Sequence, residues 1–191
     1  MVAAKIILAS ASPRRRELLD QIGVQFTICP VGIDEKPFVD EQPVAYVQRI
    51  AAEKSAAVTT NTGRLPILAA DTAVVLESDI MGKPENLQDA MRMLGQLSGK
   101  THQAYTAVSL RGKSHQQILS ITDVTFRVLT ETEIKYYWQS GESTDKAGSY
   151  AIQGLGAIFV QSITGSFSGV VGLPIFETVK LLANEGIQVL K

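Results

Sequence analysis

Cysteine is nearly absent from this sequence of 191 residues. The single cysteine, Cys29, excludes an intramolecular disulfide framework and a zinc site built from several cysteines. Charge of neither sign is in excess, because 18 Lys and Arg residues balance 19 Asp and Glu residues. Aromatic residues make up only 6% and form no stripe interleaved with basic residues. We therefore expect no nucleic-acid partner, and any site for an anion must be local.

Long apolar runs are absent as well. A membrane-spanning helix needs about 20 consecutive apolar residues, and no segment of the chain approaches that length. The apolar stretch at the start of the chain is too short for the core of a signal peptide, and charged residues follow it. The sequence therefore predicts a cytoplasmic location and no membrane partner.

The composition that remains predicts one α/β domain over residues 1–191. Hydrophobic residues make up 45% and charged residues 19%, which is enough apolar surface for a sizeable core. Strand-like and helix-like segments alternate, and long neighbouring strands in the middle favour a mixed sheet. We expect strands at 5–9, 25–29, 66–76, 101–110, 116–128, 157–160 and after Gly186. We expect helices beginning at Pro13 and Pro174 and over 43–59, 87–97 and 130–141.

The first candidate site is the turn between the first strand and the first helix. Ser12 is placed to cap this helix and Pro13 suits its first position. Three arginines follow, although the positive end of the helix dipole favours acids there, so a bound phosphate would relieve the mismatch. An ordinary capped helix with a solvated arginine face explains the same residues, and both interpretations stay open.

The second candidate site is Asp71, the one charge in a run of apolar residues from Ile67 to Leu76. Burying a lone carboxylate costs several kcal/mol unless it is paired, hydrogen-bonded or bound to a metal. Asp71 therefore faces a cleft, where it could bind a metal or activate water, or it has a structural partner. An apolar strand is more stable with no charge at all, so the pattern favours the functional interpretation.

Several scattered polar residues could join these two sites. Glu35 lies in a polar loop, Lys54 on the polar side of the second helix, and Lys83 and Lys146 in later loops. Each alone is typical of a solvated surface charge. Gln153 could read the edge of a base, because its amide offers both donors and an acceptor. Spacing along the chain does not show whether these residues meet in one cleft.

Several enzyme classes lack their signatures in this chain. The glycine-rich stretches at 148–156 and 165–172 match neither the dinucleotide-binding fingerprint nor the P-loop. His102 and His115 have no neighbouring ligand at metal-binding spacing, which argues against zinc. No serine stands in the turn that a serine hydrolase needs.

Taken together and in order, the motifs resemble the Maf family of nucleotide pyrophosphatases over nearly the whole chain. They are SASPRR at 10–15, EK at 53–54, ADT at 70–72, GKP at 82–84, LSGKTH at 97–102, DKAGSYAIQG at 145–154 and GVVGLP at 169–174. The resemblance implies hydrolysis of a nucleoside triphosphate between the α and β phosphates, with pyrophosphate as one product. It also implies an elongated mixed β-sheet flanked by helices, with two lobes around a central cleft, as in the inosine-triphosphate pyrophosphatases.

The resemblance further implies roles for nine residues of this chain. Asp71 would accept the proton of the attacking water, and Glu35 would help to bind metal or water. The residues matching positions for base choice are Arg14, Thr72 and Gln153. The residues expected to hold the phosphates are Ser12, Arg15, Lys54 and Lys83.

Cofactor and partners are implied in the same way. The family requires a divalent cation, Mg²⁺ or Mn²⁺, whose ligands the sequence leaves unknown, and its members are commonly homodimers. The Ser-Pro-Arg-Arg and Ile-Gln-Gly forms resemble the branch that acts on dTTP and UTP, with modified pyrimidine nucleotides as further candidates. The family name comes from an association with septum formation, so a non-catalytic nucleotide-binding regulator of cell division stays open. A phosphatase that removes only the γ phosphate is a second rival.

Overall fold

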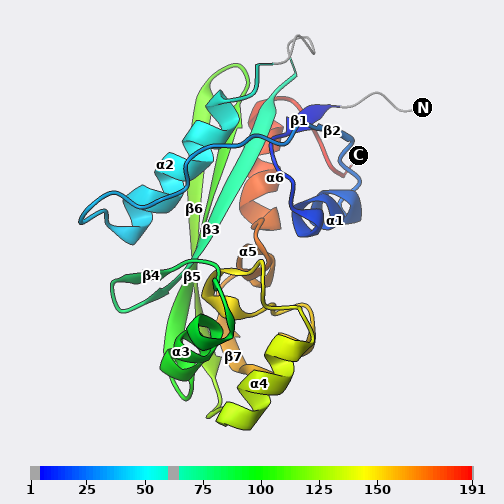
Figure 1. The fold of residues 1–191 in the computed structure, drawn as a ribbon. Helices are drawn as coiled ribbons and strands as arrows, with labels where there is room; N and C mark the ends of the chain where they lie inside the picture. The colour runs from blue at the N-terminus through cyan, green and yellow to red at the C-terminus, as the bar shows by residue number, and fades with distance from the viewer. Residues whose placement is uncertain (1–4, 60–64, 191) are drawn as a thin grey trace.

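The computed structural model describes residues 5–59 and 65–190 (Figure 1). Residues 1–4, 60–64 and 191 lie outside the described residues. The expectation that the chain has no signal peptide rests partly on residues 1–4. The strands are β1 (Ile6–Leu8), β2 (Phe26–Ile28), β3 (Ile67–Leu76), β4 (Asp79–Met81), β5 (Thr101–Arg111), β6 (His115–Phe126) and β7 (Val160–Thr164). The α-helices are α1 (Pro13–Gln21), α2 (Pro43–Ala56), α3 (Leu87–Leu97), α4 (Glu131–Gln139), α5 (Phe167–Val171) and α6 (Ile175–Asn184). Two short 3₁₀ turns are η1 (Ala147–Ser149) and η2 (Leu155–Phe159).

The strands form one seven-stranded mixed sheet, which confirms the expected fold class. Its order is β2-β1-β3-β5-β6-β7, with β4 paired to β3 as a hairpin. β2, β1 and β3 run parallel, whereas the pairs β3–β5, β5–β6 and β6–β7 are antiparallel. The long strands run from one end of the elongated molecule to the other and so connect its two lobes (Figure 1).

An opening lies along one edge of β3, where the two lobes meet. β5 pairs with β3 along nearly its whole length. On the other edge, β1 pairs only with Ile67 and Leu68, and β4 only with Val74–Leu76. Within the described chain, no strand pairs with that edge between these two contacts. Asp71 therefore stands in the middle of an uncovered stretch of an otherwise central strand.

The first lobe packs helices on both faces of the sheet. α1 and α6 cover one face, where Leu19 and Leu182 pack with Leu68 of β3. α2 covers the other face, where Ile50 packs against Ala73. Because successive strand residues point to opposite faces, Asp71 belongs to the α2 side and Thr72 to the α1 side.

The second lobe has its own aromatic core beneath α3 and α4. Phe126 is 1% exposed, and its ring lies 4.8 Å from the rings of both His102 and Tyr150. Phe159 and Leu94 complete this cluster and are fully buried. The aromatic rings meet edge to face, the arrangement that their quadrupoles favour.

Local signals placed most helix boundaries correctly. The Asn86 side chain caps α3 by accepting the N–H of Asp89. Thr130 and Glu133 form the predicted capping box at the start of α4. Helix α2 ends at Ala56 and is three residues shorter than predicted.

Two predicted strands are wrong. Residues 157–159 belong to the 3₁₀ turn η2, and the strand begins only at Val160. The Glu142 carboxylate accepts the N–H groups of Leu155 and Gly156 and so winds the chain there, a contact that no local pattern reveals. After Gly186, residues 187–190 form no strand, although Ile187 and Val189 pack against the core of the first lobe.

Among residues 5–59 and 65–190, no helix is long and apolar enough to cross a lipid bilayer.

The aromatic core predicts that loss of one of its buried rings destabilises the second lobe. Phe126→Ala removes a ring that is 1% exposed, and we expect it to lower the free energy of unfolding by about 3–5 kcal/mol. The loss combines the transfer free energy of the ring with the cavity that remains. Urea unfolding followed by circular dichroism measures it. Tyr136→Ala, at a residue 69% exposed, is the control and should change the value by less than about 0.5 kcal/mol.

Candidate active site

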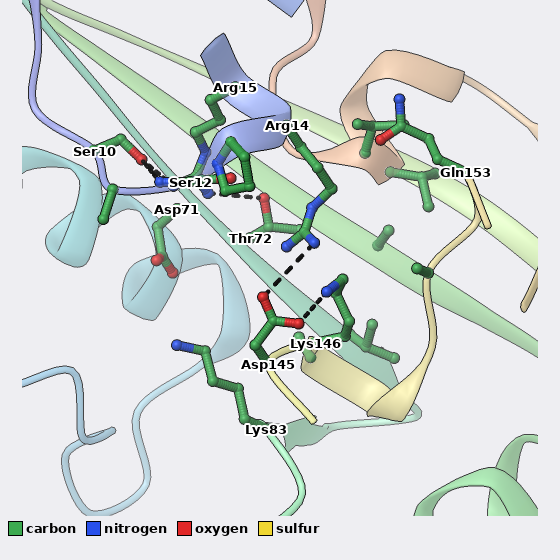
Figure 2. A pocket seen from close by; sticks show the side chains of 18 of the residues that line it. Ser10, Ser12, Arg14, Arg15, Asp71, Thr72, Lys83, Asp145, Lys146 and Gln153 are labelled. Atoms are coloured by element: carbon green, nitrogen blue, oxygen red, sulfur yellow. Dashed lines mark hydrogen bonds and ion pairs between the residues drawn. The ribbon is translucent and has the colours of Figure 1, made fainter. Parts of the chain in front are cut away.

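One cleft between the lobes, with a volume of about 330 Å³, collects all nine residues predicted for the site. They are Ser12, Arg14, Arg15, Glu35, Lys54, Asp71, Thr72, Lys83 and Gln153. All of them except Glu35 and Lys54 are labelled in Figure 2. The nine residues come from α1, α2, β3 and four loops, so they are brought together only by the fold. The structure thus shows that these residues line one cleft, which their spacing along the chain does not reveal.

A single ammonium group joins the two predicted catalytic carboxylates. Lys54 Nζ lies 2.8 Å from Asp71 Oδ1 and 3.0 Å from Glu35 Oε1. Lys54 is only 8% exposed, because α2 turns it toward β3 rather than toward solvent. The sequence pattern assigned Lys54 to the polar side of its helix, because nothing in the sequence shows that Lys54 pairs with Asp71 on β3.

Asp71 is a carboxylate on which burial and neighbouring charges act in opposite directions. It is 5% exposed, and its second oxygen, Oδ2, has no hydrogen-bond partner among the described residues. Burial raises the pKa of Asp71, and the nearby charges of Lys54 and Arg15 oppose that rise. A carboxylate with a raised pKa and a free oxygen in a cleft is a candidate proton acceptor.

The donor set around Asp71 fits a divalent cation that arrives with phosphates. No group of three or more His, Cys, Asp or Glu side chains that could hold a metal occurs within residues 5–59 and 65–190. Asp71 and Glu35 supply two carboxylates, and Mg²⁺ commonly binds one or two carboxylates together with substrate phosphates and waters. The unpartnered Oδ2 of Asp71 is the kind of buried acceptor that such an ion satisfies.

The loop that carries Glu35 is tied to α2 by two side chains. The Tyr46 hydroxyl donates to the backbone carbonyl of Glu35 at 2.9 Å. Arg49 forms a two-point ion pair with Glu41, with both N···O distances 2.7 Å, and also donates to the carbonyl of Lys36. These bonds hold Glu35 at the cleft, although the loop has no helix or strand of its own.

The start of α1 forms the cationic wall of the cleft. Ser12 occupies the N-cap position, yet its side chain makes no cap hydrogen bond, contrary to the expected capping role. Its hydroxyl therefore leaves the first-turn N–H groups to another acceptor, as an anion site requires. Arg15 donates to the carbonyl of Gly172 at 2.9 Å and to Ser10 at 3.3 Å, which fixes its guanidinium beside the cleft.

Thr72 is part of a chain of hydrogen bonds. Its hydroxyl lies 3.4 Å from Arg15 Nη2, which donates to it, and 2.9 Å from the hydroxyl of Thr106. Thr106 in turn donates to the carbonyl of Gly169 at 2.7 Å. Because Thr106 uses its proton there, Thr72 must donate to Thr106, and only an acceptor lone pair of Thr72 remains for a ligand.

On the opposite side of the cleft, an acid that was not predicted as a site residue holds two cations. Asp145 Oδ2 lies 3.9 Å from Arg14 Nη1, and Asp145 also pairs with Lys146 (Figure 2). The sequence contained Asp145 and Lys146 in the DKAGSYAIQG motif, but no local feature marked Asp145 as part of the site. Lys83 is exposed at the cleft and forms no ion pair within the described chain.

The remaining end of the cleft is largely apolar. Val74 and Tyr150 line it and belong to the core of the second lobe, Ile152 packs against that core, and Ala104 pairs with Val74 in the sheet. The exposed Gln153 follows Ile152 in the chain. Figure 2 shows Gln153 and Asp71 at opposite sides of the labelled set, with Arg14 between them. The cleft therefore has a charged end suited to phosphates and an apolar end with one amide, suited to a flat ring.

Tyr150 is fixed from behind by a buried histidine. Its hydroxyl lies 2.9 Å from His102 Nε2, and burial lowers the pKa of His102 to about 4. His102 is thus neutral at pH 7 and serves as a hydrogen-bond partner inside the second lobe.

Comparison with known proteins identifies the family. A family model described as Maf-like protein matches residues 5–185. This chain belongs to the Maf family. The Maf chain is 51% identical over 185 residues to a dTTP/UTP pyrophosphatase of Methylococcus capsulatus, covering 96% of this chain and 92% of that protein. It is 53% identical over 184 residues to a dTTP/UTP pyrophosphatase of Pseudoalteromonas atlantica, covering 93% and 95%.

A solved structure shares the architecture of the Maf chain. A HAM1 protein from Coxiella burnetii superimposes with a TM-score of 0.52 and 15% identity, covering 96% of this chain and 100% of that one. At this level of identity the likeness concerns the fold alone.

The ion pair at the centre of the Maf cleft predicts a pH-dependent loss of stability. Lys54→Met leaves Asp71 without its nearest cation, and breaking a buried ion pair costs about 3–5 kcal/mol. Burial has already raised the folded-state pKa of Asp71, so protonation stabilises the folded variant, and the loss shrinks as pH falls through that pKa.

Urea unfolding at several pH values between about 8 and 5 measures the difference between wild type and variant. Lys135→Met is the control, because the Lys135–Glu131 pair is exposed and contributes little. A Lys54→Met loss that is constant over this pH range would contradict the assignment.

Proposed function

We propose that this Maf protein hydrolyses dTTP and UTP to the nucleoside monophosphate and pyrophosphate, with modified pyrimidine nucleotides as further substrates. The observation that carries the proposal is Asp71, a carboxylate with a free oxygen, set among cations in a cleft whose other end is apolar. Relatives about half identical over nearly their whole length and named dTTP/UTP pyrophosphatase support it.

The proposed reaction begins with a water molecule next to Asp71. Asp71 accepts a proton from this water, and the water oxygen forms a bond to the α phosphorus. The bond from the α phosphorus to the bridging oxygen breaks, and its electron pair leaves with pyrophosphate. Lys54 holds Asp71 in place and keeps it ionised before the reaction. The raised pKa of Asp71 makes it a better base than an ordinary aspartate.

The charged residues of the cleft would bind the triphosphate. Arg15 and Lys83 lie where they can neutralise negative charge that builds up on the leaving pyrophosphate, and the Ser12 hydroxyl can donate a hydrogen bond to a phosphate oxygen. A divalent cation, Mg²⁺ or Mn²⁺, would neutralise further phosphate charge when bound, held by Asp71 and Glu35. Homodimerisation and a cytoplasmic location stay predictions from the sequence.

The apolar end of the cleft would receive the base. Gln153 can offer its amide oxygen and nitrogen to the edge of a pyrimidine, and Arg14 lines the same cleft. Thr72 donates its hydroxyl proton to Thr106, so it could only accept a hydrogen bond from the substrate. It would also help to hold Arg15, which donates to it.

The test is product analysis with dTTP and Mg²⁺, with Asp71→Asn as the diagnostic variant. Wild type should release dTMP and pyrophosphate, and Asp71→Asn should turn over about 10²–10⁴ times more slowly, because it lacks the proton acceptor. Asp79→Asn, in the exposed β3–β4 hairpin, is the matched control and should keep full activity. Circular dichroism checks that both variants are folded.

Other products would separate the rival functions. Release of dTDP and inorganic phosphate would identify a γ-phosphatase. Tight binding of dTTP without turnover would favour a nucleotide-binding regulator. Full dTTP hydrolysis by Asp71→Asn would reject Asp71 as the proton acceptor.

Gln153 should affect the choice of base rather than the chemical step. We expect Gln153→Ala to lower kcat/KM for dTTP by roughly tenfold, the effect of one or two hydrogen bonds, and to leave kcat/KM for GTP and ATP unchanged. Initial rates of pyrophosphate release with the three nucleotides measure this. An equal loss with all three nucleotides would show that Gln153 does not discriminate between bases.

A further inference from the structure

Two residues outside the cleft form hydrogen bonds to the backbone on either side of Gln153. Just before Gln153, the backbone N–H of Ala151 donates to the Tyr137 hydroxyl at 3.0 Å. Just after it, the N–H groups of Leu155 and Gly156 donate to the Glu142 carboxylate, each at 2.9 Å. Tyr137 and Glu142 are themselves joined by a hydrogen bond of 2.8 Å between the hydroxyl and the carboxylate.

This arrangement is tightly built. Tyr137 is 4% exposed, and its ring packs edge to face against Phe159, with the ring centres 4.9 Å apart. The Glu142 carboxylate sits so close to the backbone of Gly154 that a Cβ at this position would collide with it. Gly154 is therefore required for the carboxylate to approach the turn. Neither Tyr137 nor Glu142 lines the cleft.

Gln153 itself is not fixed by its side chain. It is exposed, and within residues 5–59 and 65–190 its amide makes no hydrogen bond. The direction of the amide therefore depends on the backbone of residues 151–156. Within the same described ranges, nothing comparable links this turn to Asp71, Lys54 or Glu35, which are held by α2 and β3.

We propose that Glu142 and Tyr137 are positioning residues that set base selectivity by holding Gln153 in the direction needed to read the base. The inference rests on the proposed function and assigns two selectivity residues that never touch the substrate. When the hydrogen bonds that join Tyr137 and Glu142 to this turn are lost, the Gln153 amide samples more orientations, and the preferred base loses its hydrogen bonds. Substrates that do not use those bonds are unaffected, because the phosphate end is held by other elements.

Two variants remove some of these hydrogen bonds and keep nearly the same side-chain volume. Glu142→Gln has only one acceptor oxygen, so at least one of the two backbone N–H groups loses its partner. Tyr137→Phe removes the acceptor for Ala151 and the donor to Glu142. The matched controls are Glu131→Gln and Tyr136→Phe, on α4 and exposed to solvent.

The experiment measures kcat/KM for dTTP and for GTP with each variant, by pyrophosphate release in the presence of Mg²⁺. Glu142→Gln and Tyr137→Phe should lower the ratio of dTTP to GTP by about tenfold, whereas the value for GTP and both controls stay at the wild-type level. The same substitutions made in a Gln153→Ala background should change the ratio no further, because Glu142 and Tyr137 act through Gln153.

Each other outcome overturns the inference or the function beneath it. Equal losses with dTTP and GTP, an unchanged ratio in a folded variant, or unfolding of both variants would show a purely structural role. A further fall of the ratio in the Gln153→Ala background would show that the two residues act on something else. A wild type that does not release pyrophosphate from dTTP would instead overturn the proposed function.

Discussion

The position of Lys54 between Asp71 and Glu35 is the interaction on which the site depends. A carboxylate in the middle of an apolar strand needs a counter-charge, and α2 delivers one from above the sheet at 2.8 Å. The same ammonium draws in Glu35 from a loop that has no regular structure. One cation thus lowers the cost of burying Asp71 and gathers the second carboxylate beside it.

The cleft exists because β3 loses its neighbours on one edge for a few residues. On this edge, β1 pairs only with the start of β3 and β4 only with its end. The middle of β3 therefore has no neighbouring strand there among the described residues. Because successive strand residues point to opposite faces, Asp71 faces α2 and Thr72 faces Arg15, and both side chains reach the cleft at the uncovered edge.

The parts of the fold that were predictable depend on neighbours in sequence. The caps at Asn86 and Thr130 and the long strands β3, β5 and β6 follow from signals a few residues wide. The strand predicted at 157–160 was wrong because the carboxylate of Glu142, more than ten residues earlier, binds the backbone there. Lys54 was placed on the polar side of α2 for a similar reason, since its partner lies seventeen residues away on another element.

The sequence by itself determined which residues are candidates for the site. A lone charge in an apolar strand and arginines at the start of a helix both cost free energy. That cost favoured a functional role for Asp71 and left a bound phosphate and a solvated face both open for the arginines. The tertiary structure alone decided that these residues share one cleft, that Ser12 leaves its cap unmade, and that Asp145 bridges Arg14 and Lys146. The physical reason is that burial cost can be read from neighbouring residues, whereas the partner that offsets it is chosen by how distant elements pack.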